Sequence, residues 1–372
     1  MPAANGPEAR PPKSAAMDQA DAPLAARIPK IHLHCHLEGS LRAQTFVDLA
    51  GRYGVPLRYR PGADAQAEPL ETGDPTDPYR FADFQEFLYA FAAVNRALRR
   101  ADDYARLARE FVADALAQNV VYGELFISPS VWTFFHPELD VREAVAAIAG
   151  ELRAARPRAE FALIVDLTRN FGAENGMRTA QLAASLTDLG VVGIGLGGDE
   201  VRFPPDQFVA AFAWAKAAGL QTVAHAGEAA GAQNVRDAVE RLGAQRIGHG
   251  IAALDDPETL ELLARNRVAL EVCPTSNAVT GVARTGEPAF VQLDRAGCVV
   301  TIDADDPAMF GTSIAREYAL VERMAGPQTL ARFVANAIDA SFAGDGVKAE
   351  LRALLAAELD PARRSGIEHV GP

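Results

Sequence analysis

Short apolar runs alternate with longer amphipathic stretches along the chain from Lys30 onward. Eight runs have the length and composition of β-strands: Ile31–His36, Val120–Ser128, Phe161–Leu167, Val191–Leu196, Gln221–Ala226, Arg246–His249, Ala269–Cys273 and Cys298–Ile302. Helix-like segments separate them, among them Pro205–Ala218, Asn234–Leu242, Pro257–Ala264 and Glu287–Ala296. This alternation predicts parallel βαβ units, and eight of them favour an α/β protein with a closed (β/α)8 barrel, the TIM barrel. A doubly wound open sheet is the alternative, but no glycine-rich dinucleotide-binding turn follows the first run.

A long stretch, residues 37–119, separates the first two runs and exceeds what one helix and two loops require. Its piece Ala63–Tyr79 is rich in Pro, Asp and Glu and is typical of a loop, whereas Phe81–Leu98 is apolar with a helical spacing. That helix is either packed on the outside of the barrel or forms a lid over the barrel mouth. After the eighth run, extra C-terminal helices are predicted at Ser313–Met324, Gln328–Ala343 and Lys348–Leu359.

Composition and charge narrow the class of protein. Hydrophobic residues make up 49% of the 372 residues, as in a globular protein with a sizeable core. No apolar run reaches the roughly 18 residues of a membrane span. The net charge of −13 leaves no basic surface for nucleic acid.

The cysteines and the N-terminus bear on compartment and domain organisation. Three cysteines without a CxxC spacing indicate a reducing compartment, and we expect a cytoplasmic protein. Residues 1–27 are rich in Ala and Pro and read as a disordered extension, not a secretory signal. Residues 28–362 are expected to form a single domain.

Polar side chains gather at the ends of the predicted strands, which in a barrel meet at one rim. His34 and His36 end the first strand and project to the same side, because strand residues alternate faces. The other strand ends carry Gly198-Asp199-Glu200, His225 with Glu228, His249, and Asp305-Asp306. Four histidines at three strand ends of one barrel indicate a metal site rather than structural histidines.

Metal chemistry explains these residue types. His34, His36, His225 and Asp305 offer three nitrogens and one oxygen, a set that suits Zn²⁺ with an open position for water. The metal would activate that water as the nucleophile. His249 would stand beside it as a proton acceptor or electrostatic partner.

Two further features refine this site. Glu228 is three residues beyond His225, where its loop could turn the carboxyl toward a substrate as a proton donor. Only four lysines occur, none of them at a predicted strand end on the rim, so the bridged two-metal arrangement is disfavoured and we expect one metal ion.

The ordered motifs HCHLEGS, GLGGDE, HAGE, GHG, CPTSN and DADDP resemble the adenosine deaminase family of the amidohydrolase superfamily. The resemblance covers Pro29 to about Ala343. It implies a zinc-dependent (β/α)8 barrel that hydrolyses the 6-amino group of adenine-type rings and releases ammonia.

The resemblance also implies roles for individual residues. His34, His36, His225 and Asp305 match zinc ligands, with His36 also in the substrate site. Glu228 matches the acid that protonates the purine N1, and His249 matches the residue that assists the activated water. Asp306 matches the carboxylate at N7, and Gly198 matches the glycine whose backbone N–H reaches N3.

Glu38 departs from the family pattern, in which adenosine enzymes carry Asp to reach the ribose 5′-hydroxyl. It could make the same contact with a shifted sugar, read another group there, or be a neutral exchange. GLGGDE and CPTSN differ from the GLDSSE and CPLSN of adenine-specific relatives and favour a nucleoside. Within the other motifs, Cys273 is expected to pack rather than react, and Asp199-Glu200 to orient the loop after the fourth strand.

We therefore expect deamination of adenosine or 2′-deoxyadenosine to the inosine analogue, in purine metabolism or salvage. The alternatives are a modified adenosine such as 6-aminodeoxyfutalosine, from a menaquinone route, or adenine; a catalytically silent binding barrel is less favoured. The expected partners are a small purine nucleoside and water, without nucleic acid or membrane, and the oligomeric state stays open.

Overall fold

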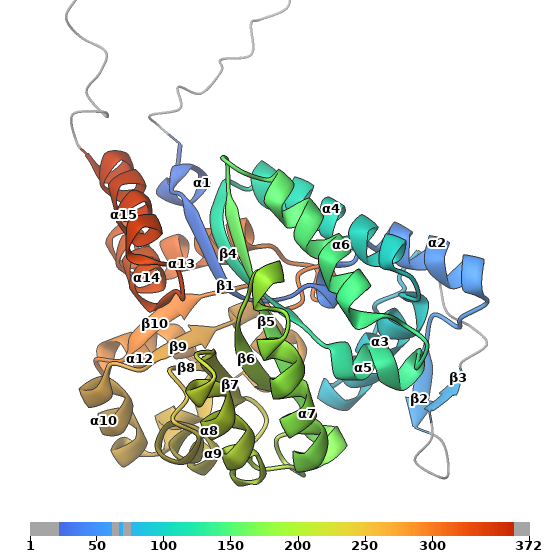
Figure 1. The fold of residues 1–372 in the computed structure, drawn as a ribbon. Coiled ribbons are helices and arrows are strands. Elements are labelled where there is room, and N and C mark those ends of the chain that lie inside the picture. Colours follow the sequence, from blue (N-terminus) through green and yellow to red (C-terminus); the bar gives the residue numbers. More distant parts are fainter. Residues whose placement is uncertain (1–21, 62–66, 70–75, 284, 361–372) are drawn as a thin grey trace, which may run out of the picture.

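The computed structural model describes residues 22–61, 67–69, 76–283 and 285–360. Eight parallel strands surround one axis and form the predicted barrel (Figure 1). Their bounds are β1 Lys30–His36, β4 Val120–Ile127, β5 Glu160–Thr168, β6 Val191–Gly197, β7 Gln221–Ala226, β8 Arg246–His249, β9 Ala269–Val272 and β10 Val299–Ile302. The strands pair in this order, and a bridge between Cys35 and Asp305 brings the end of β10 beside β1. The prediction of a TIM barrel is therefore confirmed.

Helices cover the outside of the barrel, as Figure 1 shows. Those on the connections between strands are α4 Ala101–Ala117, α6 Val141–Ala154, α7 Gly172–Ala184, α8 Val209–Ala217, α9 Ala232–Asp237, α10 Pro257–Asn266, α11 Pro274–Val279 and α12 Ala289–Arg295. The predicted closing helices are α13 Ile314–Ala325, α14 Pro327–Ala340 and α15 Asp345–Leu359. Polar caps start some of them: the Asp140 side chain accepts from Glu143 N before α6, and Ser313 from Arg316 N before α13.

Two segments differ from the predicted helices. The predicted helix over 205–218 begins as a short 3₁₀ turn, Pro205–Phe208, before α8. The segment predicted over 234–242 is α9 followed by a π-helical turn at Ala238–Leu242. In both cases the apolar spacing marked the buried face correctly but not the local backbone geometry.

The insertion after β1 contains α2 Ala43–Tyr53, the antiparallel pair β2 Tyr59–Pro61 and β3 Ala67–Pro69, and α3 Phe84–Ala97. The predicted loop at 63–79 therefore contains a short strand, and part of it lies outside the described residues. The aromatic side chains of α3 pack against the barrel and also line the central cavity. The ring centroids of Phe87 and Phe310 lie 4.9 Å apart, and Phe87 also faces the cavity. The two roles considered for this helix are thus combined.

The prediction of a disordered extension over residues 1–27 is wrong for its last residues. Leu24–Arg27 form a short helix, α1, in which Leu24 and Ala25 are buried. Their backbone N–H groups donate to the Glu322 carboxylate on α13, which satisfies the helix start. Residues 1–21 lie outside the described residues. No helix in the described ranges has both the length and the hydropathy that a membrane crossing requires.

A buried charge cluster lies inside the barrel below the strand ends. Arg246 on β8 is 2.6 Å from Glu124 Oε2 on β4 and 2.5 Å from Glu271 Oε1 on β9. Its guanidinium also stacks 3.8 Å from the centroid of the Phe342 ring. We call Glu124, Arg246 and Glu271 the floor cluster; because one cation serves two buried carboxylates, removing it leaves both uncompensated.

We predict that Arg246→Met lowers the free energy of unfolding by about 3–5 kcal/mol, the usual cost of breaking a buried ion pair by removing one partner. Urea unfolding followed by circular dichroism measures the change. Arg332→Met is the matched control, because the Arg332–Asp294 pair is largely exposed and should cost about 1 kcal/mol or less. Equal losses in the two variants would contradict the role given to the floor cluster.

Candidate active site

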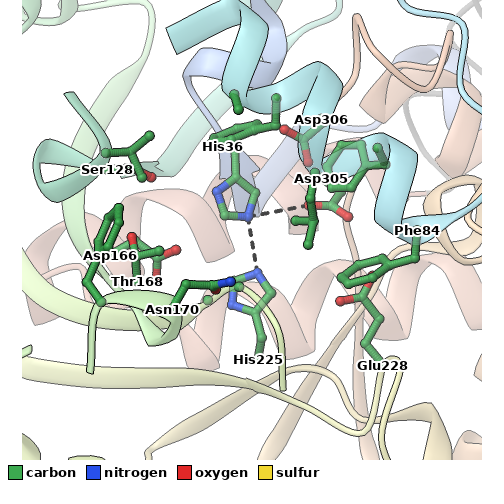
Figure 2. Close-up of a pocket in the computed structure, with 18 of the residues that line it drawn as sticks. His36, Phe84, Ser128, Asp166, Thr168, Asn170, His225, Glu228, Asp305 and Asp306 are labelled. Atoms are coloured by element: carbon green, nitrogen blue, oxygen red, sulfur yellow. Dashed lines mark hydrogen bonds and ion pairs between the residues drawn. The ribbon is translucent and has the colours of Figure 1, made fainter. Parts of the chain in front are cut away.

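Three imidazoles and one carboxylate converge at the carboxyl ends of the strands. His36 Nε2 lies 3.1 Å from His225 Nε2, and Asp305 Oδ1 lies 3.5 Å from His36 Nε2 (Figure 2). Asp305 Oδ1 is also 3.5 Å from His34 Nε2. All four residues are buried. The structure thus brings together the four residues that the sequence predicted as metal ligands, from β1, β7 and the turn after β10.

The spacing of these atoms fits a bound metal ion. In a tetrahedral site with metal–nitrogen distances near 2.0–2.1 Å, ligand atoms lie about 3.3 Å apart. Three pairs here lie at 3.1, 3.5 and 3.5 Å, and all four ligand atoms lie within 4.8 Å of one another. His34 Nε2 is buried and has no hydrogen-bond partner in the described part of the chain. Burial lowers the pKa of His36 to about 3 and that of His225 well below its ordinary value. Both are therefore neutral at pH 7, the form that binds metal.

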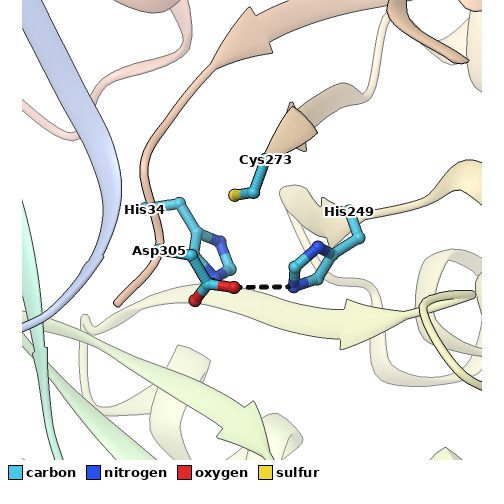
Figure 3. Close-up of side chains that lie close together, drawn as sticks. All are labelled: His34, His249, Cys273 and Asp305. Carbon is cyan, nitrogen blue, oxygen red and sulfur yellow. Dashed lines mark ion pairs between the residues drawn. The ribbon is translucent and has the colours of Figure 1, made fainter. Parts of the chain in front are cut away.

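A second group of possible ligands overlaps the first. His34 and Asp305 also lie near His249 and Cys273 (Figure 3). His34 and Asp305 belong to both groups, so the two groups cannot each bind a metal ion independently. Cys273 does not line the central cavity, and burial raises the pKa of its thiol well above the ordinary value. We therefore assign the metal to the group with His36 and His225, and Cys273 to packing.

Hydrogen bonds behind the ligands orient their rings. His34 Nδ1 lies 2.8 Å from Glu271 Oε2, and His225 Nδ1 lies 3.1 Å from the Leu196 carbonyl oxygen. Each acceptor fixes the proton on Nδ1 and leaves Nε2 for the metal. Glu271 also belongs to the floor cluster, so the metal site and the barrel interior are one connected network.

Asp305 and His249 are held in unusual backbone conformations. Their φ angles are 62° and 60°, in the left-handed region that residues other than glycine rarely adopt. The Ser276 hydroxyl donates to Asp305 Oδ2 at 2.6 Å, and the Asn277 side chain lies 3.0 Å from His249 Nδ1. The strain is therefore offset by bonds from the CPTSN segment, which gives that motif a positioning role.

Glu228 and His249 stand beside the metal cluster. His249 Nε2 lies 3.7 Å from Glu228 Oε2 and 3.8 Å from Asp305 Oδ2. Burial, and then the charge of Asp305, raise the pKa of Glu228 well above its ordinary value, so it keeps its proton. Burial lowers the pKa of His249 to about 4, so it is neutral at pH 7. A protonated acid and a free imidazole are the forms that general acid and base catalysis require.

The loop that carries Glu228, after β7, is held by Glu200, whereas the sequence predicted that Asp199-Glu200 orients the loop after the preceding barrel strand or braces metal ligands. The Glu200 carboxylate accepts hydrogen bonds from the backbone N–H groups of Gly227, Ala229 and Ala230. The bonded residues lie directly before and after Glu228 in the sequence, so they hold the Glu228 side chain in its direction toward the cavity.

Asp306 and Gly198 also line the cavity, as predicted. Asp306 Oδ1 is buried without a partner among the described residues, and burial, then Asp305, raise its pKa well above the ordinary value. A Cβ atom at Gly39 would fall 1.8 Å from that oxygen, so only glycine fits there. Gly198 has a φ of 98°, which directs the backbone of this turn along the cavity.

Glu38 lies behind the cavity wall rather than in it. It is fully buried, and its Oε1 accepts from Ser128 N at 2.8 Å and from Trp132 Nε1 at 2.7 Å. Burial raises its pKa to about 7. Its Oε2 is buried without a hydrogen-bond partner among the described residues. Glu38 thus joins the turn after β1 to the start of α5, Pro129–Phe135, and the substrate contact considered for it stays a prediction.

The central cavity has a volume of about 260 Å³ and two kinds of wall. An aromatic wall comes from α3 and the segments after β4 and β5: Phe84, Phe87, Phe91, Phe134, Phe135 and Phe171. Ser128, Asp166, Thr168 and Asn170 form a polar side, which Figure 2 shows across His36 and His225 from Glu228. Asp166 was not predicted; its signal was a lone acid inside an apolar strand run.

The place of the metal cluster, at the end of a barrel where such enzymes carry their chemistry, puts the protein in the class of TIM-barrel metal-dependent hydrolases. More closely, the chain belongs to the adenosine deaminase family, which matches residues 29–358, and it is a hydrolytic deaminase. This confirms the resemblance found in the motifs.

The similar proteins agree on the family and differ in the substrate for which they are named. The aminodeoxyfutalosine deaminase of Streptomyces avermitilis is 36% identical over 90% of this chain and 91% of its own length. The adenine deaminase of Rhodospirillum rubrum is 37% identical over 89% of this chain and 96% of its own. A solved amidohydrolase from Burkhoderia ambifaria with bound Zn has a TM-score of 0.80 at 26% identity, covering 95% of this chain and 96% of that one.

We predict that Asp305→Ala loses most of its bound metal, because the single carboxylate among the four donors disappears and only imidazoles remain. Asp306→Asn is the matched control, since the neighbouring carboxylate does not belong to the cluster. Metal content after dialysis, measured by atomic emission, compares the two. Full metal retention in Asp305→Ala would remove Asp305 from the ligand set.

Proposed function

We propose that this protein hydrolyses the 6-amino group of a purine and releases ammonia, with one zinc ion held by His34, His36, His225 and Asp305. The supporting observation is that His249 Nε2 lies between two carboxyl groups, 3.7 Å from Glu228 Oε2 and 3.8 Å from Asp305 Oδ2, beside the candidate metal cluster. Three imidazoles and one carboxylate suit zinc, which a solved relative contains. Bound zinc supplies a nucleophile by lowering the pKa of water.

Each remaining residue has a task that its environment permits. Glu228 gives its proton to ring atom N1, which makes C6 electron-poor and open to attack by water. His249 accepts one proton of that water and passes it to the departing amino group, so ammonia leaves neutral. The other proton, on the new C6 hydroxyl, returns to Glu228 as the C6 carbonyl forms. Asp306 keeps a proton and can donate a hydrogen bond to N7, while the Gly198 backbone N–H serves N3.

For the substrate, we propose a modified adenosine such as 6-aminodeoxyfutalosine rather than adenosine itself. Phe134 is 63% exposed and stacks on Phe171 at a centroid distance of 5.1 Å, both on the aromatic wall of the cavity. An exposed aromatic pair at a cavity wall suits an apolar or aromatic group attached beyond the sugar. The aminodeoxyfutalosine deaminase of Streptomyces avermitilis supports this choice.

Adenine is the second candidate. The cavity volume of about 260 Å³ lies below the range of about 300–1,000 Å³ typical of pockets for drug-sized ligands. Glu38, expected to meet a sugar, is bonded to Ser128 and Trp132 instead. Both facts suit a free base, as does the adenine deaminase relative.

For either substrate we propose a cytoplasmic enzyme, because Cys35, Cys273 and Cys298 are all free thiols.

Ammonia release by the zinc-loaded protein tests the proposal. We expect kcat/KM to be highest for 6-aminodeoxyfutalosine in a panel that also contains adenine, adenosine and 2′-deoxyadenosine. A preference of at least tenfold for adenine would establish the second candidate. A metal-loaded protein that releases no ammonia from any of the four would overturn the purine assignment.

We predict that Glu228→Gln keeps its zinc but loses about 10²-fold or more in kcat, the scale of lost general acid catalysis. In the wild type the acid is active when protonated, so kcat should fall as the pH rises through the elevated pKa of Glu228. Glu228→Gln should lack this alkaline limb, because its amide does not titrate. Near-normal turnover in Glu228→Gln, with unchanged zinc content, would refute the role in protonating N1.

A further inference from the structure

Asp166 is a buried carboxyl group that neither the metal cluster nor the proton transfers use. It lies on β5, two residues before the strand end, and its side chain lines the central cavity while the residue is only 5% exposed. Its Oδ1 is buried and has no hydrogen-bond partner among the described residues. A buried polar atom without a partner carries a free-energy penalty, which a bound group can relieve.

The neighbouring side chains do not satisfy this carboxyl group. The nearby cation, Arg169, donates to the backbone carbonyls of Phe203 and His225 instead. On the same side of the cavity, the Thr168 hydroxyl is bonded to Ser130, and Asn170 Oδ1 accepts from Asp199 N. In the region that the structure describes, Asp166 is thus the acid on this side of the cavity with an oxygen left for a ligand.

The adjacent strand leaves space for this carboxyl group. A Cβ atom at Gly195 would lie 2.5 Å from Asp166 Oδ1, and one at Gly197 would lie 2.3 Å from Asp166 Oδ2. Any larger residue at either position would displace the carboxyl. The two glycines therefore make room for an acid that the packing of the barrel does not need.

The position of Asp166 shows which part of a substrate it would meet. It lies against Gly197, the residue before Gly198, whose N–H is assigned to N3 of the purine, and Figure 2 draws it away from Glu228. In a purine, N3 and N9 are both bonded to C4 and lie on the same side of the ring. N9 bears hydrogen in a free base and the sugar in a nucleoside. Burial raises the pKa of Asp166 to about 8, so at pH 7 the group can both accept and donate a hydrogen bond.

We propose that Asp166 is a specificity-determining residue that accepts a hydrogen bond from a donor at the N9 end of the substrate. This inference rests on the proposed function. The donor is an O–H of the sugar or the N9–H of a free base, and the chemistry is the same in both cases.

The test compares substrates in pairs that differ by one donor: adenine with 9-methyladenine, and adenosine with 2′-deoxyadenosine and 3′-deoxyadenosine. In Asp166→Ala, kcat/KM should fall about 10- to 100-fold for the substrate that carries the donor, and less than about threefold for its analogue. The pair that shows the difference identifies the donor. Asp166→Asn should recover part of the loss, because its amide also accepts and donates.

Two controls make the result specific. Asp206→Asn makes the same side-chain exchange at an exposed site and should change no ratio. Zinc content and melting temperature should be unchanged in Asp166→Asn, which serves in place of Asp166→Ala if that variant does not fold. Equal losses for both members of every pair would overturn the proposal while leaving the deaminase assignment intact. If the wild type deaminates none of these purines, the proposed function fails and this inference falls with it.

Discussion

The ion pairs of Arg246 inside the barrel are the interaction on which the rest of the site depends. One guanidinium holds the carboxylates of Glu124 and Glu271 at 2.6 and 2.5 Å, with all three side chains almost inaccessible to water. The other carboxylate oxygen of Glu271 is hydrogen-bonded to His34 Nδ1. The orientation of His34, the first of the four proposed metal ligands, is therefore linked to charges on β4, β8 and β9.

The strands and most of the site follow from the sequence because both depend on local features. Buried strands of a parallel barrel are continuous apolar runs, and the catalytic residues stand at the ends of such runs. The floor cluster was not predicted, because Glu124 and Glu271 stand inside apolar runs and their partner is distant in sequence. Asp166 was missed for the same reason. A charge within a buried strand has meaning only once its neighbours across the barrel are known.

Glu38 shows a different limit. The HCHLEGS motif left its role open, whereas its hydrogen bonds depend on Ser128 and on Trp132, 94 residues later, whose indole N–H donates to it. Helix α3 is a third case. The apolar helical spacing of Phe81–Leu98 predicted this helix, and either of the two locations considered for it would have satisfied that pattern. Only the tertiary structure reveals that the helix covers both Phe310 and the cavity.

The elements that carry the reaction are separate from those that surround the rest of the substrate. The metal ligands, Glu228 and His249 come from β1, β7, β8 and the turn after β10, and the floor cluster and the CPTSN segment brace them. The aromatic wall and the polar side that contains Asp166 come from α3, α5 and the end of β5. Substitutions in this second group can change which purine fits without disturbing the metal. This separation gives a physical reason why relatives named for adenine and for aminodeoxyfutalosine share one barrel and one reaction.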